Sequence, residues 1–209
     1  LEQVQVVVAG NGCKDGTVAG LRSYLGPLAL RLVELPALGP ARARNAGADA
    51  SEGELMVFLD DDIEVVPGFL CAHAAAHAGE NTAAIGYLPP QLERQQGYFR
   101  TELRSWWENM FSAMHLPGYR YRYTNLLTGN FSIPAAIFQR LGGFDPDFKV
   151  HEDYELGLRL LKAGVQLFEL KPNAVQESRD SKMGYGSSSS SGLHAKTFAV
   201  DDARVFVGS

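Results

Sequence analysis

Long hydrophobic runs, paired cysteines and excess positive charge are all lacking in this sequence of 209 residues. No apolar run approaches the roughly eighteen residues that a membrane span needs, and no signal peptide is visible. The net charge of -5 gives no electrostatic case for nucleic acid as a partner. Cys13 and Cys71 lack the spacing of paired metal ligands and are typical of reduced thiols in a cytosolic protein, with one disulfide as the alternative.

The sequence also lacks a starting methionine and a complete dinucleotide-binding glycine pattern. The chain begins at Leu1 without a methionine and stops at Ser209 directly after an apolar run, so we expect a piece of a longer protein. The glycine turn at 10–17 has Asp15 where a dinucleotide fingerprint has its third glycine. A Rossmann cofactor site is therefore disfavoured, and an ordinary turn with a helix start is the alternative.

Hydrophobic periodicity predicts alternating strands and helices around one sizeable core. In the segment 98–115 the apolar residues recur at helical steps, and most of them are expected in that core. The predicted strands are 4–8, 30–35, 55–59, 82–88, 125–133 (broken at 129–130) and a strand within 165–172. The predicted helices are 18–25, 39–48, 68–78, 98–115, 135–141 and 151–162.

Three consecutive carboxylates, Asp60, Asp61 and Asp62, follow a strand that is predicted to be buried on both faces. Their mutual repulsion costs stability, so the fold alone does not require them. A hard divalent cation, held by one or two carboxylates and by substrate phosphates, suits such a cluster. Ligands also bind at the carboxyl ends of strands in open α/β sheets. A solvated acidic turn is the alternative.

Charged residues near two helix starts each allow two interpretations. Arg44 near the start of the helix 39–48 opposes the helix dipole, which a nucleotide phosphate or a surface glutamate would offset equally well. Glu152 and Asp153 open the helix 151–162, where simple capping is the alternative to chemistry.

His73 and His77 stand four residues apart on one predicted helix face, which is the spacing of metal ligands. The run His-Ala-Ala-Ala-His lacks the intervening glutamate of a zinc protease. An exposed or packed helix face is therefore favoured over zinc.

Taken in order, these segments resemble the family 2 glycosyltransferases with the GT-A fold over about residues 4 to 164. The matching stretches are Asn11-Gly12 with Asp15-Gly16-Thr17, Ala43-Arg44-Asn45-Ala46-Gly47, Val57-Phe58-Leu59-Asp60-Asp61-Asp62, Thr128-Gly129-Asn130, Gly142-Gly143-Phe144-Asp145 and Glu152-Asp153 with Glu155-Leu156.

The resemblance implies a role for each matched position. Asp60 and Asp62 form the Asp-x-Asp motif, which binds a divalent cation (Mg or Mn) and the diphosphate and ribose of the donor. Asp153 matches the general base that deprotonates the acceptor hydroxyl, with Glu152 beside it as a further catalytic residue. The implied nucleotide-sugar-binding residues are Asn11, Arg44, Asn45, Asp60, Asp61, Gly129 and Asn130.

The implied chemistry is self-consistent. A sugar hydroxyl is a poor nucleophile, so a carboxylate must take its proton during attack on the anomeric carbon. A metal neutralises the charge that grows on the leaving nucleoside diphosphate. A single base with in-line attack inverts that carbon.

Two departures from the family pattern favour another interpretation, a non-catalytic remnant that binds nucleotide-sugar without transferring the sugar. The family's first strand is absent before Leu1, and Gly10, followed by Asn11, stands where the family has its base-reading aspartate.

The end of the chain resembles a different family. His194, Lys196 and Asp201, followed by Gly208-Ser209, are similar to the HKD motif of the phospholipase D superfamily, in the style of cardiolipin synthases. That family brings two such motifs together, so this stretch would be half of an active site. A flexible serine linker followed by an incidental strand is the alternative.

We therefore predict an α/β protein with a GT-A-type (Rossmann-like) mixed sheet flanked by helices, N-terminally truncated, with a short strand-loop-strand C-terminal extension. The expected domains are 1–164, a glycosyltransferase domain, and 165–209, a phospholipase D-like fragment or tail joined by fusion or by a composite reading frame. The first hypothesis is an inverting, metal-dependent sugar transferase, ahead of a phosphatidyltransferase fragment using His194 and of the binding remnant.

The partners expected for the first hypothesis are a nucleoside-diphosphate sugar and a carbohydrate or lipid-linked acceptor, with no nucleic acid. The expected location is the cytoplasm, with peripheral association at the inner face of the membrane as a further expectation from the family.

Overall fold

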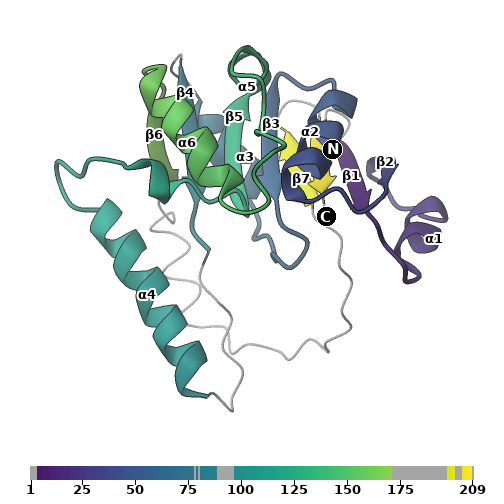
Figure 1. Cartoon of the computed structure of the whole chain (residues 1–209), viewed down its shortest axis with the longest axis horizontal. Helices are drawn as coiled ribbons and strands as arrows, with labels where there is room; N and C mark the ends of the chain where they lie inside the picture. Colours follow the sequence, from purple (N-terminus) through teal and green to yellow (C-terminus); the bar gives the residue numbers. More distant parts are fainter. Residues whose placement is uncertain are drawn as a thin grey trace.

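The computed structural model describes residues 4–77, 79, 81–88, 97–170, 197–200 and 204–208, and they form a mixed α/β fold flanked by helices, as predicted (Figure 1). The strands are β1 (Gln5–Asn11), β2 (Ala29–Leu35), β3 (Leu55–Leu59), β4 (Thr82–Gly86), β5 (Asn130–Pro134), β6 (Gln166–Leu170), β7 (Thr197–Val200) and β8 (Arg204–Gly208). The helices are α1 (Thr17–Arg22), α2 (Pro40–Ala50), α3 (Phe69–Ala76), α4 (Tyr98–Met114), the 3₁₀ turn η1 (Tyr123–Asn125), α5 (Ala135–Arg140) and α6 (Glu152–Lys162).

Hydrogen bonding groups the described strands into two four-stranded sheets, in the orders β2-β1-β7-β8 and β3-β5-β4-β6. β1 pairs in parallel with β2, and β4 pairs in parallel with β6. β5 runs antiparallel to both β3 and β4. The carboxyl end of β3 therefore lies beside the start of β5, where Leu59 pairs with Asn130.

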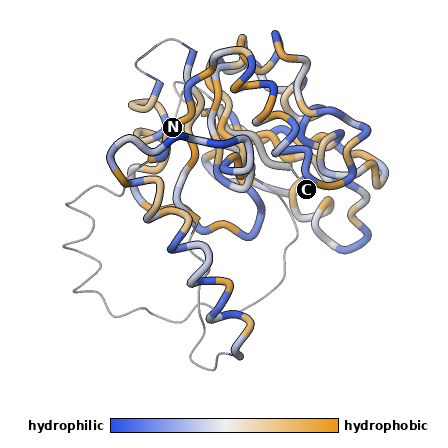
Figure 2. The backbone as a smooth tube through the Cα atoms, turned by 60° about the vertical axis from the view of Figure 1, so that its left-hand side comes forward, coloured by the Kyte–Doolittle hydropathy of each residue, from blue (hydrophilic) through white to orange (hydrophobic). Residues whose placement is uncertain are grey.

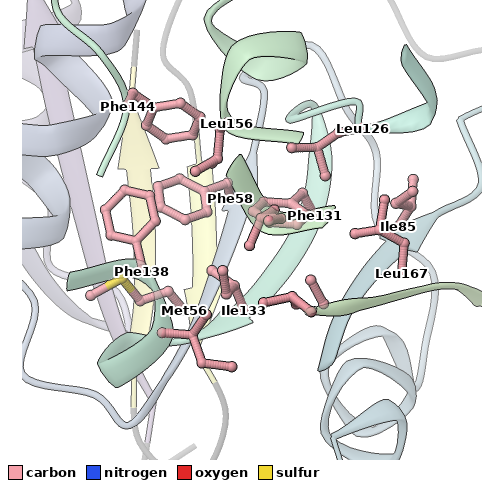
Figure 3. Packing of buried hydrophobic residues seen from close by; sticks show 14 of the residues in the cluster. Met56, Phe58, Ile85, Leu126, Phe131, Ile133, Phe138, Phe144, Leu156 and Leu167 are labelled. Carbon is pink, nitrogen blue, oxygen red and sulfur yellow. The ribbon is translucent and has the colours of Figure 1, made fainter. Parts of the chain in front are cut away.

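Aromatic side chains form the centre of the core on one face of the second sheet (Figure 3). Phe58 of β3 is fully buried, with its ring centroid 5.1 Å from that of Phe138 and 5.3 Å from that of Phe144. Phe131 of β5 and Leu156 of α6 are equally buried in the same cluster. This packing fixes α5, α6 and the loop between them against β3 and β5.

Successive residues of β3 point to opposite faces of the sheet. Met56 and Phe58 lie in the aromatic core, whereas Val57 belongs to a second cluster with Val6 and Val8 of β1, against which Phe69 of α3 packs. All five residues of β3 are buried, which confirms the predicted strand with two covered faces.

The strand β5 has one apolar face and one polar face, and both are buried. Phe131 and Ile133 lie in the aromatic core. Asn130 and Ser132 alternate with them and are contacted by His73 of α3, whose ring nitrogens lie 2.8 Å from Asn130 Oδ1 and 2.7 Å from Ser132 Oγ. His73 is fully buried, so the predicted packed helix face is confirmed for this residue.

The helix α4 extends away from the sheets (Figure 1), and polar and apolar segments alternate along it (Figure 2). Among its side chains only Phe111 and Met114, near the C-terminal end, are buried. Phe99 is 75% exposed and Trp106 is 51% exposed, so the prediction that most of the apolar residues in 98–115 are core is wrong for the first half of the helix. The periodicity predicted the helix correctly, but among the described residues the first half of α4 stays largely exposed.

Among the described residues, no helix combines the length and the apolar character that crossing a membrane requires. The described C-terminal strands, β7 and β8, form an antiparallel hairpin that pairs with β1, as the predicted strand-loop-strand extension implies. β6 follows α6 and pairs with β4. The division after residue 164 stays a prediction, and His194, Lys196 and Asp201 lie outside the described residues.

Two histidines make the stability of the fold depend on pH. Burial lowers the pKa of His73 and of His77 from 6.5 to about 4. Between pH 6.5 and about pH 4 the unfolded chain binds protons at these imidazoles that the folded chain does not bind. The free energy of unfolding is therefore full above pH 6.5 and decreases as the pH falls from 6.5 toward 4. We expect the urea midpoint to decrease steadily between pH 7.5 and pH 5.

The variant His77→Gln provides the control, because it removes one of the two groups that titrate in this range. Its urea midpoint should fall less steeply over the same pH interval. Equal slopes in the two proteins would contradict the assignment of the pH dependence to these imidazoles.

Candidate functional site

The acidic triplet lies at the turn that follows β3. The Ile63 backbone N–H donates to the Asp60 carbonyl at 3.2 Å, which makes residues 60–63 a turn with Asp61 and Asp62 at its two central positions. Asp60 is partly buried, with its side chain 27% exposed, whereas Asp62 is exposed. Asp60 and Asp61 are therefore partly buried and Asp62 is exposed, and Asp60 forms an ion pair with Arg44.

Arg44 of α2 joins the ends of two distant elements. One guanidinium nitrogen lies 3.1 Å from Asp60 Oδ1, and the other forms a hydrogen-bonded ion pair with Glu152 at the start of α6. The Arg44 side chain is 4% exposed, and its guanidinium carbon lies 5.7 Å from the centre of the Phe144 ring. Its Nε–H is buried without a hydrogen-bond partner among the described residues. One arginine thus brings the β3 turn and the start of α6 into a single site.

Asp153 follows Glu152 and belongs to the same charged cluster. Burial raises the pKa of the Asp153 carboxyl, and the negative charge of Glu152 raises it further, while the Tyr154 backbone N–H and Arg44 act in the opposite direction. Glu152 is held in the ion pair with Arg44, whereas the Asp153 carboxyl has a pKa raised above the ordinary value of aspartate by burial.

The helix α6 is held firmly at this position. His151, which precedes it, adopts the left-handed conformation with φ of 63°. A Cβ on Gly157 would lie 2.6 Å from the Tyr123 carbonyl oxygen, so only glycine permits this approach between α6 and η1. Arg159 donates to the carbonyl oxygens of Leu141 at 2.6 Å and Gly143 at 2.8 Å.

Two predicted nucleotide-site residues make contacts within the protein. The Asn45 amide donates to the Phe144 carbonyl at 2.7 Å and accepts from the Phe144 N–H at 2.8 Å, which fastens α2 to the loop before α6. Asn11 Oδ1 accepts from the Leu38 N–H at 2.7 Å. Asn45 therefore holds α2 against the loop that precedes α6, while Asn11 holds the loop that follows β2.

Gly129 and Asn130 lie beside Asp60. The Asp60 N–H donates to the Gly129 carbonyl at 3.0 Å. A Cβ on Gly129 would lie 3.0 Å from Asp60 Oδ2, so the absence of a side chain leaves room for the carboxylate. Asn130 itself points to His73.

The donor set at the β3 turn fits a hard cation held with substrate oxygens. Among the described residues no three His, Cys, Asp or Glu side chains gather as a complete metal cage. Asp60 and Asp62 supply carboxylates from one turn, and Mg²⁺ commonly takes one or two carboxylates with phosphates and water. Arg44 pairs with Asp60 and Glu152, and Asp153 lies next to Glu152 at the start of α6.

Sequence reasoning missed the role of His73 and the clamp made by Arg159. The signal for His73 was available: Asn130 and Ser132 alternate with Phe131 and Ile133, which indicates a strand with one polar face. What the sequence did not give was that α3 covers this face.

The comparison with family sequences decides the family. The model for glycosyl transferase family 2 matches residues 1–142. The chain belongs to glycosyl transferase family 2. This confirms the resemblance drawn from the ordered motifs, and the mixed sheet with flanking helices agrees with the GT-A fold. A model described as the N-terminal domain of galactosyltransferase also matches residues 108–182.

Curated relatives of this family 2 chain include validoxylamine A glucosyltransferase from Streptomyces hygroscopicus subsp. jinggangensis (strain 5008), 33% identical over 199 residues, which are 80% of this chain and 46% of that protein. The chain thus spans about half the length of this relative. An inactive polypeptide N-acetylgalactosaminyltransferase-like protein 5 from Mus musculus is 28% identical over 155 residues, covering 66% of this chain and 36% of that protein.

A short match has a different character. Cardiolipin synthase C from Escherichia coli (strain K12) is 47% identical over 51 residues, which are 24% of this chain and 11% of that protein. This similarity is higher in identity but covers little of either protein.

Removing the positive charge of Arg44 is expected to destabilise the fold strongly. Arg44→Met leaves the buried Glu152 carboxylate without its partner, which costs about 3 kcal/mol in similar buried pairs. Urea unfolding at pH 7.5 measures the loss.

The matched control is Arg42→Met on the same helix, because Arg42 is half-exposed and lies 4.0 Å from an exposed Asp147 carboxylate. Its effect should stay below about 0.5 kcal/mol. A loss of similar size in both variants would show that the buried ion pairs of Arg44 add nothing specific.

Proposed function

We propose that this chain transfers a hexosyl group from a nucleoside-diphosphate sugar to an acceptor hydroxyl, with inversion at the anomeric carbon. The observation that carries the proposal is that Arg44 forms ion pairs with both Asp60 and Glu152. These pairs bring the acidic turn after β3 close to the half-buried Asp153, which follows Glu152. Membership of glycosyl transferase family 2 supports the reaction class.

The donor diphosphate would bind at the β3 turn. Asp60 and Asp62 would hold a divalent cation, which supplies charge neutralisation for the leaving diphosphate. The buried Nε–H of Arg44, which has no hydrogen-bond partner among the described residues, is suited to donate to an anionic oxygen of the sugar nucleotide or to a bridging water molecule. Asp61, Gly129 and Asn130 would line the same end of the sheet, while Asn11 and Asn45 would act through the loops that they hold.

Asp153 would act as the general base. Its raised pKa makes it a better proton acceptor than an ordinary aspartate, and it stands beside the Arg44 site that binds the donor. Glu152 would serve the reaction by holding Arg44 rather than by taking the proton. With a single base, the acceptor oxygen attacks as its proton moves to Asp153, and the bond to the diphosphate breaks on the opposite face.

The sugar and the acceptor are proposed from the relatives. A relative named validoxylamine A glucosyltransferase makes a glucosyl donor the first to test. The acceptor would be a carbohydrate, or a lipid-linked one, contacted by the region from 98 to 123, where α4 presents exposed aromatic side chains such as Phe99 and Trp106.

Two alternatives are each favoured by one observation. The short similarity to cardiolipin synthase C favours a phospholipase D-like half-site that uses His194, Lys196 and Asp201. The similarity to an inactive transferase-like protein favours a nucleotide-sugar-binding protein without catalysis. Loss of function in His194→Ala, with Asp153→Asn unaffected, would support the first of these alternatives.

The proposed base is tested by Asp153→Asn. The amide cannot accept the proton, so we expect sugar transfer to fall at least 1000-fold while donor binding changes less than threefold. In the unsubstituted protein, kcat/KM should decline with falling pH at a pH above 3.8, the ordinary pKa of aspartate, because burial raises the pKa of Asp153.

Asp49→Asn, an exposed change on α2, is the control for both effects and should leave transfer within twofold. Transfer that survives in Asp153→Asn would remove this residue from the mechanism.

Donor binding is tested by titration calorimetry of UDP and GDP, each with and without Mn²⁺, into the chain and into Asp62→Ala. Asp62 is exposed, so this substitution is expected to leave the fold intact while weakening Mn²⁺-dependent binding at least tenfold. The absence of nucleotide binding under every condition would contradict a donor site at the β3 turn, and metal-independent binding would contradict the role of Asp60 and Asp62.

A further inference from the structure

A series of hydrogen bonds between side chains connects α3 with the strands β5 and β4. His73 lies 2.8 Å from Asn130 Oδ1 and 2.7 Å from Ser132 Oγ. His77, one helical turn later, lies 2.8 Å from the same Ser132 oxygen and 3.0 Å from Thr82 Oγ1. The two histidines therefore share Ser132, but only His73 reaches Asn130.

The partners set the direction of these hydrogen bonds. Asn130 Oδ1 can only accept, so His73 carries its proton on Nε2 and its Nδ1 accepts from the Ser132 hydroxyl. The Ser132 oxygen then accepts from His77 Nε2–H, and the other ring nitrogen of His77, Nδ1, lies 3.0 Å from Thr82 Oγ1. Both rings are neutral in this arrangement, in accord with the burial that lowers the pKa of each to about 4.

This series of hydrogen bonds ends at Asn130, which is adjacent to Asp60, the proposed metal ligand. Asn130 follows Gly129, whose carbonyl accepts from the Asp60 N–H at 3.0 Å. The Asp60 carboxylate lies against the α-carbon of Gly129, where a Cβ would be 3.0 Å from Oδ2. A shift of Asn130 therefore moves the backbone on which Asp60 rests.

We propose that His73 is a positioning residue: by holding the Asn130 amide, it fixes residues 129–130 against Asp60 and so sets the geometry of the donor site. The catalytic part of this inference rests on the proposed function. His73 touches no reacting group itself, and it acts through Asn130 and Gly129.

The test compares substitutions that keep or lose the bond to Asn130. The amide nitrogen of Gln can take the place of His Nε2, whereas the amide of Asn reaches only the place of Nδ1. His73→Gln should therefore preserve the position of Asp60, and His73→Asn and His73→Phe should lose it. His77→Phe is the matched control, because it removes hydrogen bonds to Ser132 and Thr82 without touching Asn130.

An independent variant disturbs Asn130 from its other side. A Cβ on Gly86 of β4 would overlap the Asn130 amide, so Gly86→Ala should displace that amide with His73 intact. It should reproduce the effect of His73→Phe on Asp60.

The first measurement is amide hydrogen exchange at Asp60 in the full chain, followed by NMR, because that N–H donates to Gly129. We expect exchange at least tenfold faster in His73→Asn, His73→Phe and Gly86→Ala, and within twofold of the unsubstituted protein in His73→Gln and His77→Phe. Affinity for UDP or GDP with Mn²⁺ should change in the same order, by about tenfold.

Unchanged exchange at Asp60 in His73→Phe, or an equal increase in His77→Phe, would overturn the positioning role and leave His73 as a general contributor to stability. Failure of the unsubstituted chain to bind either nucleotide would overturn the proposed function instead. The Asp60 exchange would still decide whether His73 positions this segment.

Discussion

The arrangement of the site depends on one buried guanidinium. Arg44 carries its charge into the protein and offsets it with carboxylates from two distant segments, Asp60 and Glu152. A buried charge without such partners would cost several kcal/mol, so the β3 turn and the start of α6 must stay together for the fold to keep Arg44 in place. The same requirement that stabilises the fold therefore assembles the acidic residues of the proposed transferase.

A second constraint lies on the far face of β5. Asn130 and Ser132 would meet water in a sheet with one open face, but here α3 covers them. Burying these polar groups is tolerable only because His73 and His77 complete their hydrogen bonds. The aromatic core on the other face needs no such matching, since Phe58 and Phe131 require only space and contact. One strand thus combines nonspecific packing with directional bonding.

Much of the fold could be predicted from the sequence because it depends on local patterns. The strand 55–59, the helix over 98–115 and the start of α6 at Glu152 follow from periodicity and from helix-start signals, and the structure has them. The predicted strand 125–133 was too long at its beginning, because Tyr123–Asn125 forms a 3₁₀ turn and β5 begins at Asn130. Turn geometry of this kind depends on the neighbour: here the turn packs against Gly157 of α6.

The candidate site was less predictable. Motif order indicated Asp60, Glu152 and Asp153, but only the fold shows that Glu152 is occupied by Arg44 and that Asn45 binds the backbone of Phe144. The exposed half of α4 was mistaken for core because amphipathic periodicity identifies an apolar face without identifying what covers it. Contacts between residues about a hundred positions apart leave no local signal in one sequence.

The anchoring of α6 has a mechanical consequence. Gly157 presses the helix against the Tyr123 carbonyl, and Arg159 ties it to the carbonyls of Leu141 and Gly143. Sliding along its axis or rotating about it would break these contacts together, so the helix moves only as one rigid unit with those loops. If Asp153 is the base as proposed, its carboxylate has a fixed position, and acceptors of different size would have to shift their own position to reach it.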